Sequence, residues 1–185
     1  MKRGLVILAG LAAIGYLVAM VVTGALPQNR QRVKFEAKGV MQLEPERVVR
    51  VELARGADRA AFLRGPGVGW TREGAGPVAA PVAEKLSLAV QYLHTAGPLR
   101  VLEPAELAGA DLGAFGLDRP VLSVAVHADS GAVLRAQFGG RNPDGMAQYV
   151  TVEGRGGIVL MSRFVGEEWR AVADGAFPRD EPTAR

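Results

Sequence analysis

Short runs of alternating apolar and polar residues, each followed by a turn signal, constrain the fold of this chain most strongly. In RVVRVELARG, the apolar residues Val49, Val51 and Leu53 alternate with the charged residues Arg50 and Glu52. Alternation with a period of two is typical of a strand that buries one face. The same pattern recurs in VLSVAVHAD, AVLRAQFGG and AQYVTVEGRGGIVLMS. Because tight turns join these runs, they predict antiparallel pairing of neighbouring strands.

Three other segments show helical periodicity. APVAEKLSLAVQYLHTAG carries one apolar stripe and ends at Gly97 and Pro98, which predicts a helix. EPAELAGADLGAFG, with Pro104 in its first turn, predicts a second helix, and RFVGEEWRAVADG predicts a short amphipathic third. We therefore expect an α+β fold, in which mainly antiparallel strands pack with about three helices over residues 45–175. Residues 176–185 are expected to form a disordered tail.

The first 26 residues have a different character. The segment from Gly4 to Leu26 contains no ionisable side chain apart from Tyr16. Its 23 residues would form a helix of about 34 Å, longer than the roughly 30 Å apolar core of a bilayer. The pattern predicts an N-terminal transmembrane helix that anchors the chain over residues 1–26, followed by a polar stalk over residues 27–44. A cleaved signal peptide is the alternative, because Thr23 and Ala25 resemble a cleavage site.

Orientation and packing of this segment follow from its flanks and its small residues. A short N-terminal tail with Lys2 and Arg3 before a long second part is typical of a cytoplasmic N-terminus. We therefore expect a single span in the bacterial inner membrane, with the extracytoplasmic domain on the periplasmic side. Gly15, Ala19 and Thr23 recur at four-residue spacing, which favours close packing against another membrane helix. Ordinary membrane composition is the simpler explanation of this spacing.

Composition argues against several kinds of chemistry. The chain has no cysteine, which excludes disulfides, thiolate nucleophiles, Fe–S clusters and cysteine-based zinc sites. A net charge of +3 without a basic stripe interleaved with aromatics predicts no nucleic-acid partner. The two histidines, His94 and His127, form no metal-binding pair, and no serine lies in a Gly-x-Ser-x-Gly elbow. We expect no metal, no other cofactor and no enzymatic activity.

Two tryptophans are the candidates for ligand contact. Trp70 follows a glycine-rich turn, and Trp169 lies in the last predicted helix. Either indole could stack on the ring of a bound ligand, with Tyr92 as a third stacking group. Packing in the core is the alternative interpretation of both residues.

The stretch GAFGLDRPVLSVAV is the most organised junction in the chain, because a helix signal gives way at once to a strand signal. Gly116 is expected to adopt a left-handed conformation at the helix end, with Leu117 folded back onto the last turn. Asp118 is expected to bind neighbouring backbone amides, and Pro120 disfavours helix at the residue before it. These residues predict a structural pivot rather than an active-site elbow.

The junction is also part of a wider resemblance. Gly116, Leu117, Asp118 and Pro120, together with the later strand that contains Tyr149 and Val150, form a set that resembles the bacterial family called domain of unknown function 4340. The resemblance covers roughly residues 47–172. It implies an N-terminal membrane anchor with an extracytoplasmic domain, related to auxiliary components of gliding-type ABC transporters. No catalytic residue carries over from the family to this sequence.

The leading functional hypothesis is a non-enzymatic, membrane-anchored accessory or assembly subunit of a larger inner-membrane protein complex. Its expected partners are the membrane and other subunits of that complex. The alternative is an extracytoplasmic module that binds a glycan, a lipid or a peptide. A hydrolase that uses acidic residues is a third hypothesis, in which Asp118 would be essential for activity.

Overall fold

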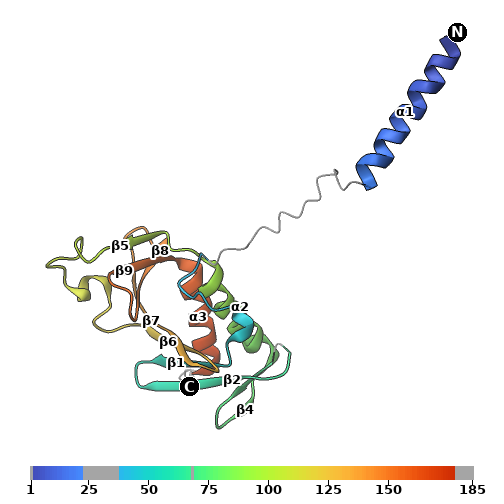
Figure 1. Cartoon of the computed structure of the whole chain (residues 1–185). Helices are drawn as coiled ribbons and strands as arrows, with labels where there is room; N and C mark the ends of the chain where they lie inside the picture. Colours follow the sequence, from blue (N-terminus) through green and yellow to red (C-terminus); the bar gives the residue numbers. More distant parts are fainter. Residues whose placement is uncertain (1, 23–37, 68, 178–185) are drawn as a thin grey trace, which may run out of the picture. The chain divides into compact units, whose positions relative to one another are not determined.

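A computed structural model describes residues 2–22, 38–67 and 69–177 of the 185-residue chain (Figure 1). The chain divides into two units, Met1–Glu36 and Ala37–Arg185, which are described separately below. The predicted tail, apart from Ala176 and Phe177, lies outside the described residues.

The first unit contains the helix α1 (Lys2–Val22). Among the described residues, no helix is both long enough and apolar enough to cross a membrane. This finding contradicts the N-terminal transmembrane helix of the expected fold. The expected span ran from Gly4 to Leu26, and its part after Val22 lies outside the described residues.

The residues predicted to pack against another helix belong to this unit. Gly15 and Ala19 lie on α1, and Thr23 lies outside the described residues. No atom lies within 4 Å of a Cβ placed on Gly15.

The second unit is built on one antiparallel sheet. Its nine strands, counted over the described residues, have the order β4-β3-β2-β1-β6-β7-β8-β9-β5. Their bounds are β1 (Arg50–Arg55), β2 (Asp58–Arg64), β3 (Trp70–Arg72), β4 (Gly76–Pro77), β5 (Arg100–Leu102), β6 (Leu122–Ala128), β7 (Gly131–Arg141), β8 (Ala147–Val152) and β9 (Ile158–Ser162). The antiparallel pairing of consecutive strands agrees with the alternating runs and tight turns of the sequence.

One long-range pairing organises the sheet. Strand β1 lies between β2 and β6, with Val51 opposite Phe62 on one side and Val126 on the other. This pairing joins two hairpins that are separated in the sequence by α2 (Ala80–Thr95) and β5. It therefore places residues about seventy positions apart on neighbouring strands.

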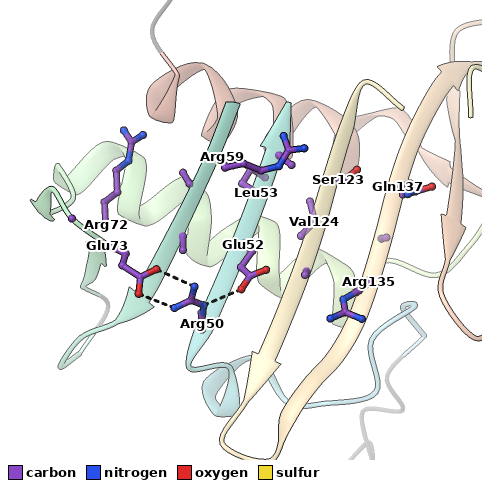
Figure 2. Close-up of a pocket in the computed structure, with 16 residues that line it drawn as sticks. Arg50, Glu52, Leu53, Arg59, Arg72, Glu73, Ser123, Val124, Arg135 and Gln137 are labelled. Atoms are coloured by element: carbon purple, nitrogen blue, oxygen red, sulfur yellow. Dashed lines mark hydrogen bonds and ion pairs between the residues drawn. The ribbon is translucent and has the colours of Figure 1, made fainter. Parts of the chain in front are cut away.

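Two helices cover one face of the sheet. Helices α2 and α3 (Arg163–Ala176) lie side by side behind the strands in Figure 2. Trp169 is fully buried, and the buried stripe of α2 consists of Ala83, Leu86, Ala89, Val90 and Leu93. Phe164, near the start of α3, is 44% exposed, and its ring meets Tyr92 edge to face at 4.9 Å.

The C-terminal end of α3 is held by arginines from the sheet. Arg55 on β1 donates to the carbonyl oxygen of Phe177 at 2.6 Å, and Arg72 on β3 donates to that of Ala176 at 2.7 Å. Both guanidinium groups also lie over the Phe177 ring. Cationic donors at this end satisfy carbonyls that the helix itself leaves unpaired.

The domain begins earlier than the sequence predicts. Residues 38–44 were expected to belong to a polar stalk, yet Met41 is 1% exposed. The N–H groups of Gly39 and Met41 donate to the carbonyls of His94 and Leu93, both at 2.9 Å. The chain thus caps the end of α2, and a Cβ on Gly39 would lie 2.1 Å from the Leu93 oxygen. This close approach explains the glycine.

The predicted second helix is wrong. Residues 104–109 form turns, and only the short 3-10 helix η2 (Leu112–Phe115) follows; a second 3-10 helix, η1 (Pro45–Arg47), precedes β1. Gly109 interrupts the segment because it adopts a φ of +80°, which lies outside the right-handed helical region. Asp111 then caps η2 by accepting a hydrogen bond from the Gly113 N–H at 3.0 Å.

The junction after η2 has the left-handed glycine that the sequence predicts. Gly116 has φ 65° and ψ 25°, and Leu117 is 6% exposed. The Val121 N–H donates to Phe138 at 2.8 Å, so strand pairing begins directly after Pro120. Among the described residues, no backbone amide donates a hydrogen bond to the Asp118 carboxylate, so this expectation is not met.

Gly116 provides a direct test of this junction. A Cβ at this position would lie 2.8 Å from the Gly140 nitrogen, in addition to the cost of a positive φ. We expect Gly116→Ala to lower the free energy of unfolding by at least about 1 kcal/mol more than Gly145→Ala. Gly145 is the matched control, because its φ is +72° with no atom within 4 Å. Equal losses in urea denaturation would contradict the close packing of the junction on β7.

Candidate functional site

The side of the sheet opposite α2 and α3 is called here the open face. Alternation along the strands sends Val51 and Leu53 into the core, while Arg50, Glu52 and Ala54 lie on the open face. Over β8, the segment with η2 covers this face, because the Phe115 ring meets the Tyr149 ring edge to face at 4.9 Å. The η2 segment also packs on Gly139 and Gly140 of β7. Over β2, β1, β6 and residues 135–137 of β7, the open face is open to solvent.

The uncovered part of the open face contains a depression of about 610 Å³, called here the hollow. Small side chains from three adjacent strands form its floor: Ala54, Ala61, Ser123 and Ala125. Long polar and charged side chains surround that floor: Arg50, Glu52, Arg59, Glu73, Arg135 and Gln137 (Figure 2).

Strand register explains why the small residues meet. Glu52 on β1 lies opposite Ala61 on β2 and Ala125 on β6, and Ala54 lies opposite Ser123. Positions paired across antiparallel strands share a face, so Ala54 and Ser123 adjoin each other, whereas Glu52 stands between Ala61 and Ala125. Alanine is depleted in strands because it packs poorly on a pleated surface. A cluster of small residues on central strands is therefore unfavourable for the sheet itself.

A three-residue ion-pair network forms one end of the hollow. Arg50 binds both carboxylate oxygens of Glu73, at 3.0 and 2.9 Å, and Glu52 Oε1 at 3.1 Å (Figure 2). The hydrogen bond that Arg50 donates to Glu73 is the main reason that the pKa of Arg50 lies above its usual value. Glu52 Oε1 also lies 3.5 Å from Nε2 of His127, which is opposite Arg50 on β6.

The remaining arginines of the rim differ in their partners. Arg135 pairs with Glu153 at 3.1 Å. Arg59 donates to two backbone carbonyls of its own hairpin, those of Gly56 at 2.6 Å and Asp58 at 2.8 Å. Among the described residues, Arg59 therefore has no carboxylate partner, although it is exposed on the rim.

The chemistry offered by the hollow is that of recognition. It combines a floor of methyl groups and one hydroxyl with cationic, anionic and amide groups around it. Within residues 2–22, 38–67 and 69–177, no group of three or more His, Asp or Glu side chains is placed to hold a metal ion. The groups that are present can bind a partner by hydrogen bonds, ion pairs and apolar contact.

The tryptophans do not take the role predicted for them. Trp70 is 2% exposed and Trp169 is fully buried, so neither indole offers a face to a ligand. The Trp70 Nε1 donates to Ser87 Oγ at 2.9 Å, and the Arg64 guanidinium lies 4.5 Å from the centre of the ring. Both residues belong to the core beneath α2 and α3, which corrects the expectation of ligand stacking.

The residues of the hollow were not identified from the sequence. A partial signal was present, because Ala54 and Ala125 occupy polar positions of alternating runs where long side chains are usual. The signal becomes informative only when β1 and β6 are known to be neighbours.

Comparisons with known proteins leave the chain unassigned. No family model matches it, and neither the curated proteins nor the solved structures contain a match.

If the fold does not require the small floor, a larger residue there should be tolerated. We expect Ala125→Val to leave the free energy of unfolding unchanged or raise it by up to about 1 kcal/mol, because valine favours a strand. Ala136→Val is the matched control on the neighbouring strand, since Ala136 faces the core and is 1% exposed. Overpacking there should cost about 1–3 kcal/mol. Equal destabilisation by both changes in urea denaturation would show that the small floor is a requirement of folding.

Proposed function

We propose that this chain is a non-enzymatic accessory subunit that binds a protein partner through the open face of its sheet. The observation that supports this function is the hollow. Small residues occupy outward positions of central strands, with charged residues beside them. Natural proteins often retain residues that are poor for stability where function depends on them.

The edges of the sheet favour the face as the binding surface. Strand addition requires a long free edge with unpaired backbone groups. The edge strand β4 has two residues and includes Pro77, and the edge strand β5 has three. Short edges and proline are typical of sheets that avoid edge-to-edge pairing. A partner that binds this sheet therefore has more surface to use on the open face.

A substitution on the floor tests this function. Ala125→Arg places a long cationic side chain in the hollow without touching the core, because Ala125 lies on the open face. We expect the purified chain to carry a stoichiometric protein partner that Ala125→Arg removes, as measured by native mass spectrometry. Thr71→Arg is the matched control, because Thr71 lies on the same face, opposite Leu63, but outside the hollow.

Two results would count against the proposal. The first is a wild-type chain that purifies as a monomer with no associated protein under mild conditions. The second is a complex that resists Ala125→Arg as well as Thr71→Arg. Circular dichroism of both variants separates loss of binding from loss of folding.

The volume of the hollow favours a second candidate function, the binding of a small molecule such as a glycan fragment. Small-molecule sites commonly enclose about 300–1,000 Å³, and the hollow falls in this range. This candidate requires a ligand that raises the melting temperature of the wild-type chain but not that of Ala125→Arg. A thermal-shift screen of envelope fragments, short peptides and sugars compares the two functions directly.

A further inference from the structure

We infer that the hollow binds an extended acidic segment of the protein partner, with a carboxylate of that segment paired to Arg59. This inference rests on the proposed function, because it specifies what the open face recognises. Its starting point is the balance of charges around the floor.

The hollow carries one cation in excess. Arg50, Arg59 and Arg135 lie on the open face of its lining, together with the two carboxylates Glu52 and Glu73, which gives three minus two, or +1. Arg72, the fourth arginine of the lining, points instead to the end of α3.

Glu153, outside the lining, balances Arg135, and Arg59 is the open-face arginine of the lining that no carboxylate of the described residues holds. Arg50 is held by Glu52 and Glu73, and Arg135 is held by Glu153 outside the hollow. Among the described residues, the hydrogen bonds of Arg59 use only its Nη1 atom and reach only backbone carbonyls. Its other donors can pair with a carboxylate side on, in the planar arrangement that guanidinium groups favour.

The dimensions of the hollow suit an extended segment. It reaches across β2, β1, β6 and β7. Three strand spacings of about 4.8 Å give a width of roughly 14 Å, which about four extended residues span at 3.3 Å each. The floor of alanine methyl groups leaves room for small side chains of such a segment.

Arg59 also fixes the position of the acidic residue. Figure 2 shows Arg59 at one end of the hollow, the pair of Arg50 and Glu73 at the other, and Glu52 between them. The register agrees, because Arg59 lies opposite Ala54, Glu52 opposite Ala61 and Arg50 opposite Leu63. An acidic side chain bound beside Arg59 therefore lies away from Glu73, whereas the same side chain at the other end would meet it.

Blocked pentapeptide pools provide the test. The central residue is fixed as Asp, Asn or Lys, and the flanking positions are mixtures of Gly, Ala, Ser and Val. Binding to the full chain is measured by fluorescence anisotropy at low salt. We expect the Asp pool to bind about three- to fivefold more tightly than the Asn pool, the range of a solvent-exposed ion pair. The Lys pool should bind more weakly than both.

Three variants test whether Arg59 causes the preference for the Asp pool. Arg59→Gln should make the Asp and Asn pools equal, while Arg119→Gln, an exposed arginine outside the hollow, should leave the difference intact. Arg59→Glu should reverse the order in favour of the Lys pool. A reversed preference is a gain of binding, so misfolding cannot produce it.

The outcomes separate this inference from the proposed function. If wild type shows no preference for Asp, or if Arg59→Gln retains it, the acidic partner is excluded. The open face remains the binding surface in that case, provided that Ala125→Arg still removes the partner. If free acetate or succinate competes as strongly as the Asp pool, the site recognises a small carboxylate and the extended segment is excluded. If wild type shows no preference for the Asp pool and Ala125→Arg does not remove the protein partner, both proposals are wrong.

Discussion

Burial of one face of the sheet beneath α2 and α3 is the interaction on which the rest of the structure depends. Trp169 and Leu86 bring the two helices onto the inward side chains of β1, β6 and β7, where Val51 and Val126 are fully buried. An antiparallel sheet needs only one buried face. Because the helices supply that burial, the other face can carry residues chosen for a different purpose.

The open face carries an unusual set of residues at its outward strand positions. Outward positions of strands usually carry long polar residues or β-branched ones, which support the strand. Here Ala54, Ala61 and Ala125 occupy central positions, and the charged residues stand around them. The network of Arg50 holds two carboxylates in place at one end, while Arg59 retains free donors at the other. From these fixed charges and this small floor we propose that the surface binds a partner.

The sequence contains local information about this fold and little about its long-range pairing. Alternation predicts the strands and the helical stripe predicts α2, because both patterns depend on neighbouring residues. The expected helix after Pro104 failed because Gly109 takes a positive φ, and the expected transmembrane helix failed because the described helices do not meet its requirements. The hollow could not be predicted, since it exists only when β1 and β6 become neighbours.

Site-specific photo-crosslinking tests the central claim most directly, because it reports what touches the open face in the cell. A photoreactive amino acid at Ser123 lies on the floor of the hollow, and the same group at Glu84 lies on the exposed side of α2. The account predicts one discrete crosslinked protein from position 123 and none from position 84. A crosslink from position 84 with none from position 123 would contradict it.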